Sequence, residues 1–248
     1  MRGDDHRALL SYLKFVSADA AMPTASRHAS EAPVFAVIPA HNEAGQVGRI
    51  VRKTAPFVDK VVVVDDGSAD STFEQAQQAG ADVLRNIINM GKGAALRTGC
   101  DYAIMKRAAR IIVLDADGQH DPADIPRLLE ELDHVRIVYT YRTFDRKMPF
   151  VFRIGNGIIN ATLNLLSGTS LRDTQCGYRA FRATDYDRLR WRANDYSVES
   201  EMIMRASRSH LPSRQVPIKT VYLHEYKGTT IIDGIKIVIG IILMWLRR

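Results

Sequence analysis

The segment DADGQH, residues 115–120, has the side chains of a metal site. Asp115, Asp117 and Gln119 alternate along the chain directly after an apolar run. Mg²⁺ and Mn²⁺ prefer oxygen ligands, of which the protein often supplies few while phosphate and water supply the rest. We therefore interpret Asp117 and Gln119 as metal ligands, and Asp115 as a residue that holds a sugar hydroxyl or orients the site. The alternative is an aspartate that only caps the next helix.

Two other polar segments also follow apolar runs. They are PAHNE, residues 39–43, and DDGSADST, residues 65–72. Paired carboxylates at the end of a strand suit hydrogen bonds to ribose hydroxyls or to the edge of a base. The alternative for the second segment is a turn at Asp-Gly, with Ser68 or Asp70 capping the following helix.

The glycine-rich segment NMGKGAAL, residues 89–96, matches neither common phosphate-binding motif. It lacks the G-x-x-x-x-G-K-[ST] spacing of a phosphate loop, and Leu96 takes the last glycine position of G-x-G-x-x-G. An ATPase and a dinucleotide-dependent dehydrogenase are therefore disfavoured. We expect Gly91 and Gly93 to allow a close approach to a ligand, with Lys92 near a phosphate or a sugar.

His41 and His120 lie beside carboxylates, which raises the question of acid–base catalysis. No nucleophile elbow and no H-E-x-x-H motif accompanies them. We therefore do not assign catalysis to a histidine.

The elements that would position these segments alternate between strand and helix. Apolar runs predict strands at 34–38, 60–65, 81–85, 110–115 and 136–140, and helical periods fill the gaps at 44–55, 70–79, 92–108 and 122–133. This order predicts an α/β fold with a mainly parallel central sheet flanked by helices. Ligands of such sheets bind beyond the carboxyl ends of the strands, where the three polar segments lie.

The rest of the chain is expected to form a basic loop at 141–153, mostly helices from residue 154, and short strands near 176–181 and 214–223. The division that we predict is an N-terminal extension at 1–32, a principal domain at 33–228 and an apolar C-terminal helix at 229–248.

Both ends of the chain carry apolar residues. Leu9, Leu13 and Val16 suit one face of a short helix. At the other end, the apolar core from Ile237 to Leu246 is half of the roughly 20 residues that a membrane-spanning helix needs. We interpret this segment as an amphipathic or interfacial helix that lies on a membrane surface or packs on the domain.

The composition is that of a folded protein with an anionic partner. Of the 248 residues 46% are apolar and 25% charged, which excludes general disorder, collagen and coiled coil. The net charge of +6 favours phosphate, nucleic acid or an acidic membrane surface, and does not choose among them. The two cysteines have neither the number nor the spacing of a disulfide scaffold or a metal site.

Five motifs in order, PAHNE, VDDGSADST, NMGKGAA, DADGQHDPADIP and DTQCGYRAF, resemble family 2 glycosyltransferases of the GT-A fold. The likeness is to the branch of dolichol-phosphate mannosyltransferases and polyprenyl-phosphate glycosyltransferases. It extends from about Val34 to Tyr226 and implies a role for each matching residue.

On the donor side, the resemblance implies contacts with the nucleotide, the sugar and the metal. The nucleotide-sugar would contact Pro39, His41, Glu43, Val64 through its backbone, Asp66, Lys92, Asp115, Ala116 and Asp117, while Asp117 and Gln119 would hold Mg²⁺ or Mn²⁺.

On the acceptor side, it implies contacts with phosphate and the sugar pocket. Arg142 would face donor or acceptor phosphates, Arg153 the lipid phosphate, Asp173 and Gln175 the acceptor side, Glu199 and Glu201 the sugar pocket, and Lys219 and Lys227 more weakly the diphosphate. Asp117 and Arg142 would be the catalytic residues.

The activity that the resemblance implies is a metal-dependent, inverting transfer of one sugar from a GDP-mannose or UDP-glucose type of donor to a dolichyl-type polyprenyl phosphate. The acceptor phosphate is largely ionised at neutral pH, so little help from a general base is needed. The partners would be the donor, the acceptor and the cytosolic face of a membrane, without nucleic acid. We expect the protein either to dock reversibly on the membrane or to bind a partner that supplies the membrane anchor. A homo-oligomer is the alternative assembly.

Three other functions remain as alternatives. A saccharide or small-molecule acceptor would call for an acidic base motif of the E-D-x-x-x-W type, to which DRLRW at 187–191 is the nearest match. A nucleotide-sugar-binding regulator would not need the intact DADGQ. A nucleotidyltransferase would need a basic, glycine-rich segment where PAHNE stands.

Overall fold

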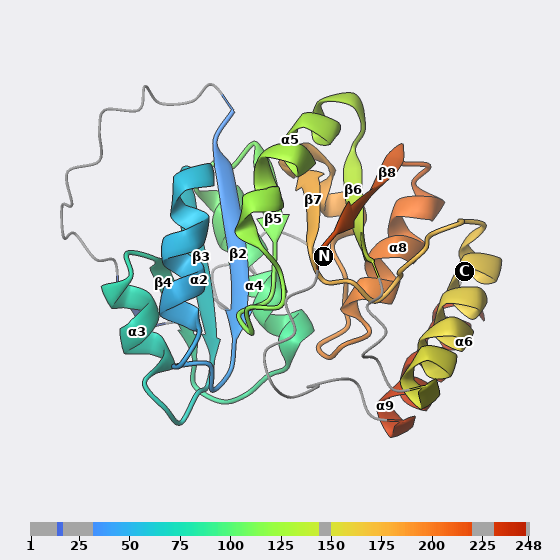
Figure 1. Cartoon of the computed structure of the whole chain (residues 1–248), viewed down its shortest axis with the longest axis horizontal. Helices are drawn as coiled ribbons and strands as arrows, with labels where there is room; N and C mark the ends of the chain where they lie inside the picture. The colour runs from blue at the N-terminus through green and yellow to red at the C-terminus, as the bar shows by residue number, and fades with distance from the viewer. Residues whose placement is uncertain (1–13, 17–31, 144–149, 220–230, 247–248) are drawn as a thin grey trace, which may run out of the picture.

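The computed structural model describes residues 14–16, 32–143, 150–219 and 231–246, without the side chains of 14–16, 150–154, 231–236 and 244. Within this part an eight-stranded sheet has the order β1-β4-β3-β2-β5-β7-β6-β8 (Figure 1). The strands are β1 (Lys14–Val16), β2 (Val34–Ala40), β3 (Lys60–Asp66), β4 (Asp82–Asn86), β5 (Arg110–Val113), β6 (Ile137–Arg142), β7 (Arg179–Arg182) and β8 (Ser213–Ile218).

Parallel pairing joins β4, β3, β2 and β5, and it also joins β6 to β8. Strand β7 is antiparallel to both of its neighbours, β5 and β6. The carboxyl ends of β2, β3, β5 and β6 therefore lie at one edge of the sheet, and the segments that follow these strands converge there. The prediction of an α/β fold with a mainly parallel sheet is confirmed.

Two layers of helices cover the sheet, with α2 and α4 on opposite faces (Figure 1). On one face lie α2 (Val47–Thr54), α3 (Thr72–Gln78) and α5 (Ile125–His134). On the other face lie α4 (Lys92–Met105), α6 (Phe150–Ser167), α7 (Tyr186–Leu189), α8 (Val198–Arg208) and α9 (Ile231–Leu246). Short 3-10 turns span Ala55–Phe57, Pro122–Asp124 and Ala183–Asp185.

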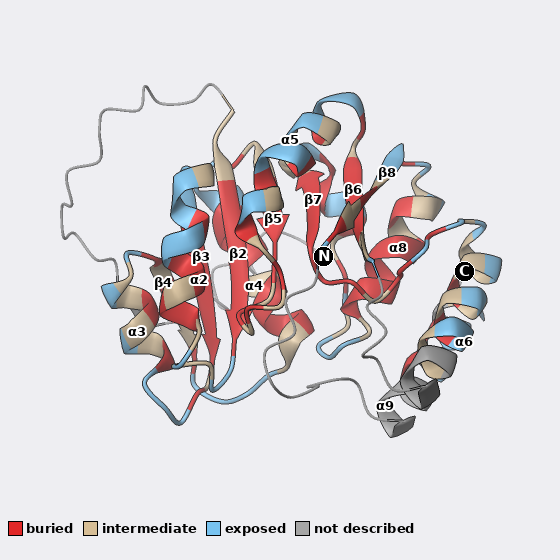
Figure 2. Ribbon diagram, viewed as in Figure 1, coloured by how far each residue is buried: buried red, intermediate tan, exposed pale blue. Residues whose placement is uncertain are grey.

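The central strands β2 and β3 are mostly apolar because both of their faces are buried (Figure 2). In β2, Val37 points into the core beneath α4 while Ile38 points into the core beneath α2. Val62 and Val63 of β3 divide in the same way. The central strands are thus held from both sides, which fixes where their carboxyl ends lie.

The sequence analysis predicted a short helix that includes Val16. In the structure Val16 lies in the strand β1 instead. This strand pairs antiparallel with β4 at the edge of the sheet. The free backbone groups of an edge strand offer hydrogen bonds to a passing segment, which favours the extended form. Leu9 and Leu13 lie outside the described residues.

Other boundaries differ from the sequence prediction by a few residues. The expected loop at 141–153 is shorter, because β6 continues to Arg142 and α6 begins at Phe150, with residues 144–149 outside the described part. The expected helix at 122–133 begins as a 3-10 turn in which Asp121 accepts a hydrogen bond from the Ala123 amide.

Helix α9 packs against α6 and α8. Its residues Ile237 and Ile241 are buried in the core, whereas Ile239, Ile242 and Leu243 are exposed. One face of the helix thus belongs to the folded domain and another apolar face is open. Across the described residues, none of the helices combines the length and the apolar character that crossing a membrane requires.

Candidate active site

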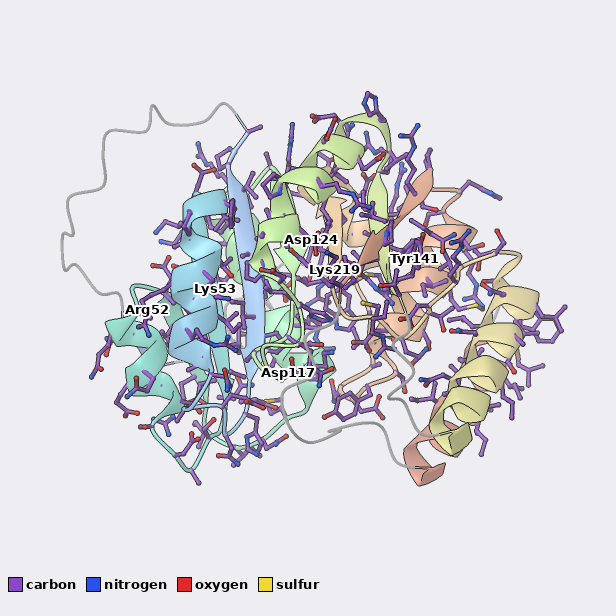
Figure 3. The ribbon with its side chains drawn as sticks, in the orientation of Figure 1. Arg52, Lys53, Asp117, Asp124, Tyr141 and Lys219 are labelled. Carbon is purple, nitrogen blue, oxygen red and sulfur yellow. The ribbon has the colours of Figure 1, made fainter. Side chains whose placement is uncertain are left out.

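A cavity of about 410 Å³ opens at the carboxyl edge of the sheet. Figure 3 shows Asp117 there, where the segments after β2 and β5 approach each other. Twelve of the residues predicted from the sequence line this cavity: Pro39, His41, Glu43, Asp66, Lys92, Asp115, Ala116, Asp117, Gln119, Arg142, Gln175 and Glu199. Residues from seven separate segments of the chain thus meet around one cavity.

The first wall of the cavity consists of the loops after β2 and β3, which hydrogen bonds join. The Asn42 amide donates to Ser68 Oγ at 2.9 Å, and the Ala69 amide donates back to Asn42 Oδ1 at 2.9 Å. His41 Nδ1 lies 2.9 Å from the carbonyl of Asp66, which can only accept, so this nitrogen carries the proton. Nε2 of His41 then accepts a hydrogen bond from Nδ2 of the Asn42 side chain. The imidazole is therefore held as part of the wall.

Asp66 holds the loop between β4 and α4. Its carboxylate accepts from Asn86 Nδ2 at 2.7 Å and from the amides of Met90 at 2.9 Å and Gly91 at 2.7 Å. Gly91 has a φ of 94°, and a Cβ there would lie 2.3 Å from the Asn194 carbonyl oxygen, so only glycine fits. Asp66 thus positions the start of α4 while it lines the cavity.

Lys92 begins α4 and bridges two carboxylates. Its Nζ lies 2.7 Å from Asp115 Oδ1 and 2.8 Å from Glu199 Oε1. Burial by itself would raise the pKa of Asp115, but the ammonium of Lys92 outweighs it and lowers this pKa below its ordinary value. Burial by itself would lower the pKa of Lys92, and the two carboxylates raise it instead. Asp115 and Lys92 are therefore both charged at neutral pH.

Gly177 closes this cluster from one side. A Cβ at this position would lie 2.8 Å from Asp115 Oδ2 and 2.9 Å from Lys92 Nζ. The glycine of DTQCGYRAF therefore lets the backbone pack directly against the ion pair.

Asp117 and Gln119 have few hydrogen-bond partners within the described part of the chain. Asp117 Oδ1 accepts from the Gln119 amide at 2.9 Å. Neither its Oδ2 nor the side chain of Gln119 has a hydrogen-bond partner among the described residues. Burial, and then the neighbouring charge of Asp115, raise the pKa of Asp117. A divalent cation beside these oxygens would oppose that shift, because its charge stabilises the ionised carboxylate.

Asp117 and Gln119 fit a Mg²⁺ or Mn²⁺ ion that phosphate and water also ligate better than a metal ion that only protein side chains ligate. Within the described residues, no group of three or more His, Cys, Asp and Glu side chains could hold a metal. Hard cations that bind phosphates commonly take only one or two protein ligands and complete their shell with phosphate and water. Asp117 and Gln119 match this pattern.

The cavity is strongly acidic. Its lining side chains include six carboxylates (Glu43, Asp66, Asp115, Asp117, Asp195 and Glu199) and two cations (Lys92 and Arg142), a formal charge of −4. A diphosphate would be repelled unless a cation accompanied it.

His120 is packed beneath the acidic loop. Nδ1 accepts from the Asp115 amide at 3.4 Å, and Nε2 lies 3.8 Å from Cys176 Sγ, which lies 3.0 Å from Thr140 Oγ1. Burial lowers the pKa of His120, so the ring is neutral at pH 7. The ring also packs against Tyr178. His120 thus supports the loop and does not line the cavity.

Arg142, at the end of β6, faces the cavity and pairs with Asp173. Nε lies 2.7 Å from Asp173 Oδ2, and Nη2 lies 3.2 Å from Oδ1. Burial by itself would raise the pKa of Asp173, but the guanidinium outweighs it and lowers this pKa. The carboxylate therefore fixes the direction of the arginine, and Asp173 itself is buried behind the cavity lining.

Other predicted site residues lie away from the cavity. Val64 is buried in β3, and the carboxylate of Glu201 binds the amides of Arg192 and Ala193 and the side chain of Arg205. Lys219 lies beside Asp124, away from Asp117 (Figure 3).

Two further predictions cannot be placed at the cavity. Arg153 belongs to α6 but its side chain is outside the described set, and Lys227 is outside the described residues.

Four polar residues of the cavity lining were missed by the sequence analysis: Asn89, Asn156, Asp195 and Tyr196. Asn89 stands in a motif, so its position could have indicated it. Asn156 comes from α6, and the other two precede α8 in a segment that has no motif of its own. The contact that brings this segment in is the hydrogen bond from the Gly93 amide to the Asn194 carbonyl, which only the folded chain creates.

Comparison with known proteins identifies the family. Residues 35–190 match the family model described as glycosyl transferase family 2. The UDP-N-acetylglucosamine–dolichyl-phosphate N-acetylglucosaminyltransferase of Methanococcus voltae is 30% identical over 233 residues, which cover 82% of this chain and 92% of that protein. The polyprenol monophosphomannose synthase of Mycolicibacterium smegmatis is 28% identical over 198 residues, covering 73% and 75%.

A solved structure supports the fold. The chain is similar to the glucosyl-3-phosphoglycerate synthase from Mycobacterium tuberculosis in complex with Mn²⁺, uridine diphosphate and phosphoglyceric acid, with a TM-score of 0.69 and 18% identity. The similarity covers 88% of this chain and 78% of that one. The architecture is thus that of the GT-A fold, as the sequence predicted.

Proposed function

Because the chain belongs to glycosyl transferase family 2 and is therefore a glycosyltransferase, we propose that it transfers one sugar from a nucleoside diphosphate sugar to a polyprenyl phosphate. The relatives named for dolichyl phosphate and polyprenol support this acceptor. The donor would be of the GDP-mannose or UDP-glucose type, and the reaction would need Mg²⁺ or Mn²⁺.

The observation that carries the proposal is that Asp117 Oδ2 and the side chain of Gln119 have no hydrogen-bond partner among the described residues, in a cavity whose lining has a formal charge of −4. Such a cavity favours a diphosphate only together with a divalent cation. When bound, the cation would offset the charge that develops on the leaving diphosphate. The joined loops after β2 and β3 would hold the nucleoside. Asp117 and Gln119 would bind the cation next to the diphosphate.

Arg142 would act on the acceptor side. Asp173 holds its guanidinium in a fixed direction at the cavity, so the arginine needs little reorganisation to bind a phosphate. A phosphate monoester is mostly ionised at neutral pH and can attack the anomeric carbon without giving up a proton to the protein. His120 lies outside the cavity lining and its Nδ1 accepts from the Asp115 amide, which is consistent with a reaction in which this histidine is not a base.

A long lipid acceptor calls for contact with a membrane surface, and α6 and α9 offer one. Both helices expose apolar side chains, Ile158 and Leu165 on α6 and Ile239, Ile242, Leu243 and Leu246 on α9. We propose that these side chains, the open apolar face of α6 and α9, dock on the cytosolic side of a membrane, with the acceptor phosphate reaching the cavity from there.

The test is a donor panel. The protein is incubated with labelled UDP- and GDP-sugars and Mn²⁺, with and without polyprenyl phosphate, and label is measured in the organic and aqueous phases. Label that enters the organic phase only with polyprenyl phosphate supports the proposal and identifies the donor. If nucleotide is released while the label stays in the aqueous phase, the acceptor is instead a saccharide or a small molecule.

A further inference from the structure

One face of α6 carries an asparagine at every fourth position. The three residues are Asn156, Asn160 and Asn164, and Asn156 lines the cavity. Asparagine is a poor helix former, so its repetition on one face is not explained by the stability of the helix. The structure shows what two of these side chains do: Asn160 and Asn164 hold the segment 169–174, which precedes β7.

Asn160 binds the backbone on both sides of Asp173. Its Nδ2 donates to the carbonyl of Arg172 at 3.1 Å, and its Oδ1 accepts from the amide of Thr174 at 2.9 Å. The hydroxyl of Thr174 donates to the same oxygen. Thr174 is completely buried, so loss of this partner would leave buried polar groups to be satisfied in another way. One side-chain amide thus fixes the position of Asp173 in the fold.

Asp173 in turn fixes Arg142. The carboxylate is 4% exposed, and its Oδ2 accepts from Arg142 Nε at 2.7 Å and from the Arg142 amide at 3.3 Å. Its Oδ1 lies 3.2 Å from Arg142 Nη2. A two-point contact between a guanidinium and a carboxylate requires both groups to keep their relative position. A shift of the backbone around Asp173 would therefore turn the guanidinium of Arg142 at the cavity.

Asn164 makes the same kind of contact farther from Asp173. Its Nδ2 donates to the carbonyl of Leu171 at 2.8 Å, and its Oδ1 accepts from the amide of Leu171 at 2.9 Å. Leu171 is also buried in the core, and the amide of Arg172 donates to Gln215 Oε1 at 2.7 Å. The backbone between Leu171 and Asp173 thus has an anchor apart from Asn164. Asn164 is therefore a matched control for Asn160 on the same face of the same helix.

We propose that Asn160 is a positioning residue for the acceptor: through Asp173 it sets the direction in which Arg142 meets the acceptor phosphate. This inference rests on the proposed function, because it takes Arg142 as a phosphate-binding residue on the acceptor side. Among the described residues, the hydrogen bonds of Asn160 go to Arg172 and Thr174 and not to the loops that we assign to the nucleotide and the metal. Its loss therefore affects the acceptor and leaves donor binding intact.

The test compares Asn160→Ala with Asn164→Ala. Sugar transfer to a short, water-soluble polyprenyl phosphate is measured with Mn²⁺ and the donor that wild type uses, and kcat and KM for the acceptor are determined. Nucleotide binding with Mn²⁺ is measured by titration calorimetry, and stability by urea unfolding. Asn160→Gln keeps the amide group but moves it by one methylene, and it replaces the alanine variant if that protein does not fold.

We expect Asn160→Ala to raise the KM for the acceptor by at least about 10-fold, while its affinity for the nucleotide stays within about twofold of wild type. Asn164→Ala should lower the urea midpoint to a similar extent and keep the acceptor KM within about twofold of wild type.

A double-mutant cycle tests the route through Asp173. In Asn160→Ala/Asp173→Asn, kcat/KM for the acceptor should be no lower than in Asp173→Asn alone, because both changes break the same connection to Arg142.

Three results would overturn the inference. The first is an acceptor KM that is unchanged in the Asn160 variant. The second is an equal rise in Asn164→Ala, which would indicate a general loosening of the contact between α6 and this segment. The third is an additive loss in the double variant, which would mean that Asn160 does not act through Asp173. A wild-type protein that transfers no sugar to polyprenyl phosphate contradicts the proposed function itself, so the two failures are distinguishable.

Discussion

Single residues in this cavity have separable tasks, and Asp117 has the most direct one. Its Oδ2 has no partner among the described residues, and burial and Asp115 raise its pKa. We expect Asp117→Asn to lower sugar transfer by at least about 100-fold, because one charge that supports the leaving diphosphate is lost. We also expect Mn²⁺ to increase the affinity of wild type for the nucleotide, and to have no such effect on Asp117→Asn.

The control for Asp117→Asn is Asp133→Asn, the same chemical change at an exposed site that pairs with Arg110. Transfer by Asp133→Asn should equal that of wild type. Full activity of Asp117→Asn in the same preparation would show that sugar transfer does not require the Asp117 carboxylate.

Asp173 couples the orientation of Arg142 to stability. The folded-state pKa of this carboxyl is below its ordinary value, so its ion pair stabilises the fold above pH about 4 and is lost as pH falls below that. We expect Asp173→Asn to lower the free energy of unfolding at pH 7 by about 1–3 kcal/mol. The difference from wild type, measured by urea unfolding, should narrow between about pH 4 and pH 2.

A difference in unfolding free energy that stays constant down to pH 2 would mean that the carboxyl is not held ionised by Arg142. A loss of transfer at pH 7 that exceeds the loss of folded protein would show that Asp173 also positions Arg142 for the reaction.

At the scale of elements, the cavity depends on a loop whose backbone touches an ion pair. A methyl group at Gly177 would lie 2.8 Å from Asp115 Oδ2 and 2.9 Å from Lys92 Nζ. We expect Gly177→Ala to reduce transfer by about 10-fold or more, because the pair must shift within a packed site. Circular dichroism should report an unchanged secondary structure.

Gly240→Ala provides the comparison, since a Cβ there makes only an ordinary contact of 3.8 Å with Ser197 Oγ. It should retain wild-type transfer. If Gly177→Ala is equally active, the Lys92–Asp115 pair tolerates displacement and its geometry is not required.

The elements were predictable where the pattern was local. Continuous apolar runs in β2 and β3 and the helical period of α2 identified their type, because burial on both faces or on one face leaves a direct trace in the sequence. The antiparallel direction of β7 left no such trace, since it depends on pairing with β5 and β6, which lie far away in the chain.

The same distinction holds for the site. Asp66, Lys92, Asp115 and Asp117 stand in motifs at the ends of strands or at the start of a helix, where a parallel sheet must bring its loops together. Tyr196 and its neighbours reach the cavity by packing against α4, and no local pattern records that contact. Glu201, two residues from Glu199, turns instead to Arg205 and to backbone amides.

For the whole molecule, the open apolar face of α6 and α9 predicts binding to lipid. We expect the protein to sediment with vesicles of anionic phospholipid, and the double variant Leu243→Glu/Leu246→Glu to lose most of this binding, because both side chains are exposed on α9. The double variant Ile104→Glu/Met105→Glu places the same two charges on exposed apolar residues at the end of α4, and it should bind as wild type.

Vesicle binding that the double variant retains would mean that another surface docks on the membrane. Transfer to a short, water-soluble polyprenyl phosphate should persist in the double variant, because the cavity is unchanged. Loss of that transfer would indicate damage to the fold and not to docking.

We propose that the acidic cavity transfers a sugar to a polyprenyl phosphate. This is tested by Mn²⁺-dependent incorporation of labelled donor sugar into organic-extractable polyprenyl phosphate by wild type and Asp117→Asn side by side. We predict label in the organic phase for wild type, none without the lipid phosphate or after chelation of the metal, and at most about 1% of the wild-type rate for the variant. Incorporation that is equal in the two proteins, or that continues without the lipid phosphate, would contradict it.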